Sequence, residues 1–267
     1  MKSAYIQFKP ALYDIQKNIR KIDGLIEKVK SADLIVLPEL ASTGYNFKDL
    51  DSAKNCAEEI QKSQFVEFLI AKAKQHNSYL VAGFNELLND DLYNSSVLVG
   101  PNGYIGKYQK IHLYFNEKDI FKTGNAGLNV YDIECAKIGM LICYDYLFPE
   151  IWRIMALKGA EIIAHSSNLL TTNAQKTIPA QAFMNKYFII TANRIGTEGE
   201  FTFNGNSFVT DPNADIIDRA SATEEEVRLV EFNPQDSHNK WINERNHALQ
   251  DRQPNLYKEI IKNSNLD

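Results

Sequence analysis

The chain has 267 residues, 44% hydrophobic and 24% charged, which is enough apolar material to bury a globular core. The formal net charge is −5, and Lys and Glu are mixed along the sequence, so the clustered basic face that nucleic-acid binding requires is excluded. Without an N-terminal leader or a run of about eighteen apolar residues, we expect a cytoplasmic protein with no membrane contact. Three cysteines, an odd and sparse set, predict a reducing compartment and no disulfide framework.

The N-terminal part of the chain predicts a strand, a helix and a second strand. Ala4–Phe8 is an apolar segment, and Asp14–Lys30 places isoleucines at three- and four-residue steps, the spacing of an amphipathic helix. Asp33–Leu37, with the sequence DLIVL, is a nearly continuous apolar run that Pro38 stops. Such a run is typical of a strand covered on both faces, so we predict that the two strands are parallel.

The rest of the chain continues this alternation and then turns to shorter strands. Helices are predicted near Ile60–His76, Pro149–Lys158 and Ala174–Lys186. Strands are predicted at Tyr79–Phe84, Ser95–Gly100, Tyr104–Tyr108, Val130–Ile133, Ile138–Cys143, Glu161–Ala164, Phe188–Asn193, Ser207–Thr210, Asp215–Asp218 and Val227–Phe232. The last three are joined by turn-rich pieces such as DPNAD, which favours antiparallel pairing. Beyond Pro234, a polar tail with Trp241 and Tyr257 is expected to pack against the body or a partner subunit.

The chain is interpreted as one domain over residues 1–267, because no segment rich in Pro, Ser and Gly divides it. The expected fold class is mixed α/β with a large sheet content. Two sheets packed together with helices on the outside would bury the apolar faces of these elements.

Cys143 is the most informative candidate for chemistry. The strand KIGMLIC ends at it, and a predicted helix begins within a few residues, so the thiol lies at a strand-to-helix elbow where α/β sheets bind ligands. Nearby helix amides would stabilise a thiolate and an oxyanion. The alternative is a buried, inert cysteine, and Cys56 and Cys135 are interpreted in that way.

Two charged residues stand at comparable strand ends. Glu39 follows a buried strand and Pro38, where a carboxylate shielded from water is suited to general base catalysis. Lys110 lies in KYQKIHLY, anchored by Ile111 and Leu113. Taken singly, each is also typical of a solvated surface residue.

The stretches LPEL, KYQKIHLY and ICYDYLFPE, which contain Glu39, Lys110 and Cys143, together resemble the three signature blocks of the nitrilase superfamily of carbon–nitrogen hydrolases in order, spacing and flanking residues. The resemblance extends over essentially the whole chain. It includes the stretches AYIQF, FNEKDIFKTG, SSN, ANRIG and FNGNSFVTDP.

The resemblance implies a four-layer α-β-β-α sandwich in which Glu39, Lys110 and Cys143 line one pocket as base, cationic stabiliser and nucleophile. Glu117 in FNEKD matches a second family glutamate that would hold Lys110 or orient the substrate amide. Lys110 and the backbone N–H of Tyr144 would stabilise the oxyanion of a thioester mechanism. No metal or organic cofactor is needed. The resemblance also implies a homodimer, stacked through the helices after Cys143 and near the C-terminus.

Three positions depart from the family pattern. Leu147 stands where an arginine is common, Ala214 where a glycine often closes the turn, and Ser166 where a proline is frequent. None is a predicted catalytic group, although Leu147 removes an ion pair used elsewhere in the family.

The predicted substrate is a small linear amide, because Tyr144-Asp145 after the cysteine resembles the amidase and carbamoylase branches more than typical nitrilases. An N-carbamoyl amine hydrolase and a nitrilase stay open as alternatives with the same triad. Further candidates for substrate contact are Tyr45, Asn168, Asn193 and Phe203, of which Tyr45 and Phe203 could equally be core aromatics.

Two rival classes remain. A papain-like cysteine protease would need a histidine base, for which His112 and His165 are the candidates, and neither lies in a block typical of such proteases. A catalytically silent binding protein could share the scaffold. Metal hydrolases, serine hydrolases and nucleotide-binding enzymes are disfavoured because HExxH, G-x-S-x-G and the P-loop pattern do not occur in the sequence.

Overall fold

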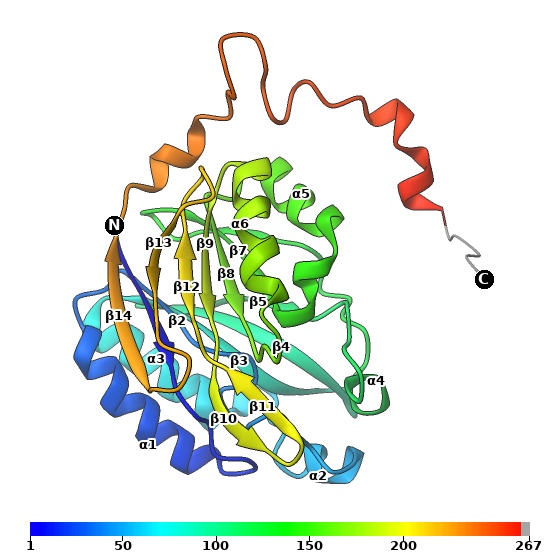
Figure 1. Cartoon of the computed structure of the whole chain (residues 1–267). Helices are drawn as coiled ribbons and strands as arrows, with labels where there is room; N and C mark the ends of the chain where they lie inside the picture. Colours follow the sequence, from blue (N-terminus) through cyan, green and yellow to red (C-terminus); the bar gives the residue numbers. More distant parts are fainter. Residues whose placement is uncertain (263–267) are drawn as a thin grey trace.

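A computed structural model describes residues 1–262 and contains two six-stranded sheets packed face to face. Strand order is β14-β1-β2-β3-β4-β5 in the first sheet and β13-β12-β9-β8-β7-β6 in the second. Helices α1 and α3 cover the outer face of the first sheet, and α5 and α6 cover that of the second (Figure 1). The four-layer α-β-β-α sandwich is therefore confirmed.

The bounds of these elements agree with most of the predicted segments. The first sheet contains β1 Lys2–Gln7, β2 Leu34–Val36, β3 Tyr79–Leu88, β4 Asp91–Gly100, β5 Gly103–Gln109 and β14 Glu226–Glu231. The second contains β6 Val130–Asp132, β7 Lys137–Ile142, β8 Ile162–Ser166, β9 Phe188–Ala192, β12 Phe208–Thr210 and β13 Ile216–Arg219. The covering helices are α1 Ile15–Ile26, α3 Gln64–His76, α5 Pro149–Leu157 and α6 Asn173–Asn185.

Strand pairing follows the predicted pattern. In the first sheet β1, β2 and β3 are parallel, and in the second β7, β8 and β9 are parallel. The late strands pair antiparallel, β12 with β9 and β13, and β14 with β1. Because the carboxyl ends of parallel strands lie at one edge of a sheet, the segments that follow β2 and β7 can carry functional side chains.

Alternate residues of each strand enter different layers of the core. In β1, Ala4 and Ile6 pack with α1 and α3, whereas Tyr5 between them faces the second sheet. The layer between the sheets contains residues of both sheets, so neither sheet could bury its inner face alone. This shared core supports the single-domain interpretation, which stays a prediction.

Three local features differ from the sequence interpretation. A hairpin of β10 (Ile195–Glu198) and β11 (Phe201–Asn204) was not predicted, although GTEGEFTFN carries a Gly turn between β-formers. Strands β3 and β4 are also longer than predicted because their pairing continues through polar residues. Cys135 is exposed in the turn before β7, so its interpretation as a buried cysteine was wrong.

The C-terminal tail leaves the sandwich after β14 and runs along one end of the molecule (Figure 1). It contains short 3-10 turns at Pro234–His238, Pro254–Leu256 and Lys258–Ile261. Lys240 Nζ donates to the carbonyl of Lys186, and Arg153 donates to that of Ala248 at 3.2 Å, so part of the tail is held against the body. Within residues 1–262, no helix combines the length and apolar character needed to cross a membrane.

Candidate active site

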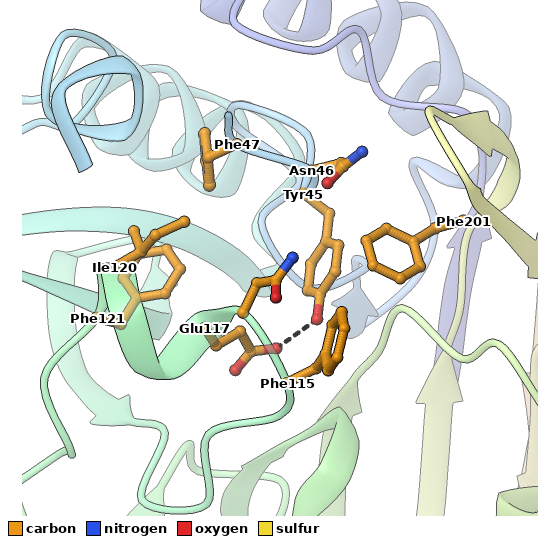
Figure 2. A pocket seen from close by; sticks show the side chains of 9 residues that line it. Tyr45, Asn46, Phe47, Phe115, Glu117, Ile120, Phe121 and Phe201 are labelled. Atoms are coloured by element: carbon orange, nitrogen blue, oxygen red, sulfur yellow. Dashed lines mark hydrogen bonds between the residues drawn. The ribbon is translucent and has the colours of Figure 1, made fainter. Parts of the chain in front are cut away.

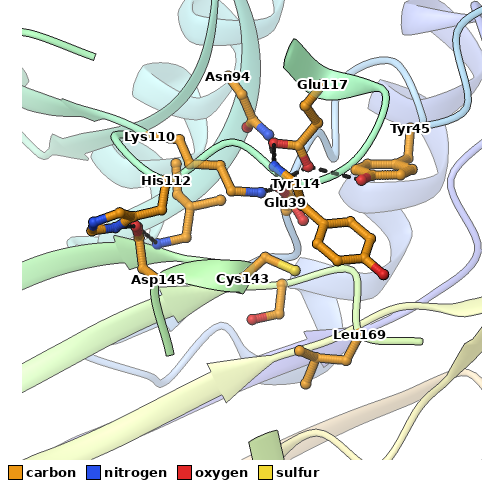
Figure 3. A network of polar contacts seen from close by, with 12 residues as sticks. Glu39, Tyr45, Asn94, Lys110, His112, Tyr114, Glu117, Cys143, Asp145 and Leu169 are labelled. Atoms are coloured by element: carbon orange, nitrogen blue, oxygen red, sulfur yellow. Dashed lines mark hydrogen bonds and ion pairs between the residues drawn. The ribbon is translucent and has the colours of Figure 1, made fainter. Parts of the chain in front are cut away.

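The three predicted catalytic side chains meet between the sheets, although they lie far apart in the sequence. Glu39 follows β2, Lys110 follows β5 and Cys143 follows β7. Lys110 Nζ donates to Glu39 Oε1 at 2.7 Å, and both side chains are completely buried. The Cys143 sulfur lies beside this pair (Figure 3).

Glu117 completes the charged cluster. It begins the short helix α4 (Glu117–Ile120), and its Oε1 accepts from Lys110 Nζ at 2.8 Å and from the Tyr45 hydroxyl at 2.8 Å. The backbone N–H of Tyr114 donates to the other oxygen at 3.2 Å. Lys110 is therefore held between two carboxylates, as the prediction for Glu117 requires.

The charges in the cluster shift one another's pKa values. Burial lowers the pKa of Lys110, but Glu117 and Glu39 outweigh burial and hold that pKa above its usual range, so the amine stays cationic. Burial raises the pKa of Glu117 to about 7 against the opposing charge of Lys110. Burial, followed by the charge of Glu39, raises the pKa of the Cys143 thiol, so the resting sulfur is protonated and needs a base.

One carboxylate oxygen of Glu39 is free to act as the base for the Cys143 thiol. Lys110 and the Asn94 side chain both donate to Oε1, each at 2.7 Å. Oε2 is buried and has no hydrogen-bond partner among the described residues. A buried carboxylate oxygen without a donor is costly unless something supplies a proton, and the neighbouring thiol can do so.

The backbone at Cys143 is a tight elbow. The residue follows β7 with φ +43°, in the left-handed region that only a few non-glycine residues adopt, and such strain concentrates at functional sites. Two buried groups hold it there. His165 Nε2 lies 3.0 Å from the Cys143 carbonyl oxygen, and the Asp145 side chain accepts from the Ile142 N–H at 2.9 Å.

Asp145 is a structural centre that the sequence interpretation did not identify. Its carboxylate also accepts from the Tyr108 hydroxyl at 2.8 Å and contacts His112 Nδ1 at 2.7 Å. The His112 ring stacks on Phe148, with centroids 3.6 Å apart. The available signal was an acidic residue two positions after a cysteine at a strand end. A carboxylate in a buried turn needs several hydrogen-bond donors.

Glycines allow the chain segments around the site to approach closely. A Cβ on Gly83 in β3 would lie 2.4 Å from the Glu39 Cα. A Cβ on Gly124 would lie 2.1 Å from the Gln109 carbonyl oxygen, directly before Lys110. No side chain fits at either position without moving a catalytic candidate.

A cavity of about 170 Å³ opens beside the sulfur, and we call it the Cys143 cavity. It is lined by Tyr114, Cys143, Tyr144, Tyr146, Asn168, Leu169, Leu170, Thr171 and Asn173. Cys143, Asn168 and Leu169 are buried in it, whereas Tyr114, Thr171 and Asn173 are exposed at its rim. The predicted residues Asn168 and Tyr144 thus lie where a substrate of Cys143 would bind.

The other predicted contacts do not line this cavity. The Tyr45 hydroxyl donates to Glu117 beside a separate space of only about 10 Å³ among aromatic side chains (Figure 2). Asn193 accepts from the Leu169 N–H at 2.8 Å, and the buried Phe203 packs on Tyr45 and beneath Arg194. For these three the geometry indicates support of neighbouring groups, and their role in substrate contact stays a prediction.

The histidines do not form a thiol–imidazole pair among the described contacts. Burial lowers the pKa of His165 to about 4, and its ring contacts the carbonyl of Cys143 and the hydroxyls of Thr191 and Ser167. His112 contacts Asp145. Within residues 1–262, no group of three or more His, Cys, Asp or Glu residues is arranged to hold a metal ion.

Comparison with known proteins identifies the family. Residues 2–239 match the carbon-nitrogen hydrolase family model. The chain belongs to the carbon-nitrogen hydrolase family. A curated nitrilase from Pyrococcus abyssi is 41% identical over 96% of this chain and 99% of its own length. A citrullinase from Francisella tularensis is 31% identical over 92% of this chain and 93% of its own.

Solved structures of carbon-nitrogen hydrolases share the fold. One from Helicobacter pylori superimposes with a TM-score of 0.87 at 24% identity, covering 98% of each chain. An amidase from Nesterenkonia sp. gives a TM-score of 0.81 at 23% identity over 98% of this chain and 96% of its own. The α-β-β-α sandwich is the nitrilase-superfamily fold, and the chain is a hydrolase of non-peptide carbon–nitrogen bonds.

Proposed function

We propose that this carbon-nitrogen hydrolase cleaves a small linear amide to a carboxylic acid and ammonia through a thioester on Cys143. The observation that carries the proposal is the unpartnered Oε2 of Glu39, buried in the cluster that contains a protonated thiol and a fixed ammonium group. A base, a nucleophile and a cation beside one cavity are what amide cleavage demands.

The first half of the reaction forms the thioester. Glu39 takes the proton from the Cys143 thiol, and the sulfur bonds to the carbonyl carbon. Lys110 and the backbone N–H of Tyr144 stabilise the resulting oxyanion, and donors of this kind contribute about 3 kcal/mol each. Glu39 then passes the proton to the amide nitrogen, the carbon–nitrogen bond breaks and ammonia leaves.

The second half returns the enzyme to its resting state. Glu39 takes a proton from an incoming water, and the oxygen of that water bonds to the thioester carbon. The carbon–sulfur bond breaks, the acid leaves, and the proton returns to the sulfur. Glu117 and Tyr45 keep Lys110 in place throughout both halves.

The cavity beside Cys143 has room for a small substrate. Its volume of about 170 Å³ exceeds the roughly 10–15 Å³ that one water-sized group needs. A carboxamide has three non-hydrogen atoms, so a short acyl chain also fits. The described residues that line the cavity are tyrosines, leucines, a cysteine and uncharged amide or hydroxyl side chains, which favour an uncharged chain.

Ammonia release measured across short amides, ω-amides, carbamoyl amines and nitriles tests the proposal. We expect the highest kcat/KM for a short uncharged amide such as butyramide. Turnover of nitriles alone would contradict amide hydrolysis and favour the activity in the name of the Pyrococcus relative. Preference for carbamoyl compounds would favour the type of activity in the name of the curated citrullinase. If no compound is turned over and none forms an adduct with Cys143, the scaffold is a silent binding protein.

We also propose a homodimer, on the basis of apolar side chains exposed around α5, α6 and the tail. Ile154 and Leu157 of α5, Phe183 and Met184 of α6, and Trp241 of the tail are between 37% and 50% exposed. A second copy stacked on these helices would cover them. Light scattering at about twice the mass of the chain would support the dimer, and the mass of one chain would contradict it. The cytoplasmic location stays a prediction.

A further inference from the structure

Asn168 differs from every other asparagine in the described part of the chain. It follows β8 and lines the Cys143 cavity with only 3% of its surface exposed. Within residues 1–262, it is the one asparagine whose side-chain nitrogen and oxygen are both buried without a hydrogen-bond partner. Turning the carboxamide over exchanges the two atoms and leaves both unpartnered, so the observation does not depend on its orientation.

The position of Asn168 ties this unpaired group to the reaction. Asn168 and Cys143 line the same cavity, and the Asn168 backbone N–H acts to lower the pKa of the Cys143 thiol, which places the residue next to the nucleophile. A buried carboxamide with no partner on either side destabilises a protein. The cost is offset when a ligand that occupies the cavity supplies both a donor and an acceptor.

We propose that the Asn168 side chain binds the –CO–NH2 group of the substrate and makes the enzyme select carboxamides over nitriles. A primary carboxamide has N–H donors and a carbonyl acceptor, so it can satisfy both atoms of Asn168. A nitrile carries only an acceptor nitrogen. It would leave Oδ1 of Asn168 buried and unpaired, and sites built to hydrogen-bond a substrate strongly reject analogues that lack the matching group.

The unpaired Glu39 oxygen points to the same chemistry. Glu39 Oε2 and Asn168 Oδ1 are both acceptors without a donor among the described residues. Asn168 Nδ2 is an unpaired donor in the same cluster, so a ligand meets both acceptors and a donor there. A molecule bearing both N–H groups and a carbonyl, whether an amide or a carbamoyl compound, matches this set. The inference rests on the proposed function, because it assumes that Cys143 attacks a molecule in this cavity.

The test compares butyramide with butyronitrile in the wild-type enzyme, in Asn168→Leu and in Asn168→Ala. We expect kcat/KM for the amide to fall about 100-fold in both variants, the effect of leaving one buried hydrogen-bonding group unpaired. For the nitrile, kcat/KM should stay the same or rise, because neither variant leaves an asparagine Oδ1 unpaired. If the wild-type enzyme does not turn over the nitrile, the inhibition constant of butyronitrile, measured with butyramide as the substrate, replaces kcat/KM.

Thermal unfolding separates binding from a structural role. Because Asn168→Leu removes an unpaired polar group, its Tm should equal or exceed that of the wild type. Asn185→Leu is the matched control: Asn185 is also buried with an unpaired Oδ1 but lies at the end of α6, and its side-chain nitrogen donates to Gln181. We expect this control to keep the wild-type preference for amide over nitrile while its Tm falls.

The outcomes distinguish the inference from the proposed function. Equal losses for amide and nitrile, no loss for either, or a lowered Tm or failure to fold in both Asn168 variants would overturn the role of Asn168 and leave amide hydrolysis standing. Wild-type turnover of the nitrile alone would overturn the proposed function and the inference with it.

Discussion

Two Glu–Lys pairs involve lysines only three residues apart, one pair completely buried and the other with a partly exposed lysine, and they differ in how the carboxylate oxygens are used. Glu86 pairs with Lys107, and Glu39 pairs with Lys110. In the first pair both carboxylate oxygens are used: Oε1 by Lys107, and Oε2 by the side chains of Ser95 and Gln109. In the second pair, Glu39 Oε2 has no partner among the described residues.

The difference shows that a buried ion pair does not by itself mark a reaction site. Both pairs take a carboxylate out of water and need good geometry to offset the cost. Only the Glu39 pair leaves a proton acceptor next to a thiol and a cavity. Glu86 is therefore a structural residue in this account, and Glu39 is the base.

Replacing the base should have the largest effect on activity. In Glu39→Gln the side chain keeps its shape but can no longer take the thiol proton, so kcat for a short amide should fall by about 1000-fold or more. Ammonia release measures it, with circular dichroism as the control for folding. Retained activity in Glu39→Gln would refute the assignment of the base.

Replacing the two lysines should give the next largest difference in activity. Lys110→Met leaves Glu39 and Glu117 facing each other without a cation and removes an oxyanion donor, so kcat should fall about 100-fold or more and the Tm should drop. Lys107→Met is the matched control, because Lys107 lies three residues earlier and its partner Glu86 keeps two other donors. Equal losses of activity in the two variants would remove the distinction between the pairs.

A smaller effect is expected from Tyr45. The pKa of Glu117 is raised by burial to about 7, and the Tyr45 hydroxyl stabilises the carboxylate that holds Lys110. We therefore expect kcat/KM to rise with pH through about 7. In Tyr45→Phe the pKa of Glu117 rises further. The rise in kcat/KM should therefore move to higher pH, with little change in the maximum value of kcat/KM. A profile that stays in place, or moves to lower pH, would contradict the role of Tyr45.

The structural pair should give the smallest effect on catalysis. Glu86→Gln leaves Lys107 without its buried counter-charge, so the free energy of unfolding should fall by about 1–3 kcal/mol. Urea denaturation measures this change. Activity per folded molecule should stay within twofold of the wild type, and a tenfold loss would show that Glu86 also serves the reaction.

The sequence predicted the scaffold well because its strands carry continuous apolar runs. The runs DLIVL and KIGMLIC form β2 and β7, and Glu39 and Cys143 follow these two strands, as their positions in the sequence predicted. The predicted link between Lys110 and Glu117 also appears as a direct contact. These features are local in the sequence or belong to blocks with a recognisable pattern.

What the sequence could not predict depends on contacts between distant segments. Asn94 in β4 is one of several buried polar residues of its strand, and nothing local indicates that it is the one that donates to Glu39. The Asp145 network joins Tyr108 and His112 from another strand end. Conversely, Asn193 and Phe203 were nominated from block membership, and neither lines the cavity. Asn193 instead accepts from the Leu169 N–H, and Phe203 packs beneath Arg194.

The central claim is that Cys143 forms the covalent bond to substrate with Glu39 as its base. Intact-mass measurement and peptide mapping after rapid acid quenching of wild type, Glu39→Gln and Cys143→Ala with a short amide test it directly. We predict an acyl adduct on the Cys143 peptide of the wild type, a greatly slowed adduct in Glu39→Gln and none in Cys143→Ala. Amide turnover with the adduct on Cys56 or Cys135, or hydrolysis by Cys143→Ala at the wild-type rate, would contradict the account.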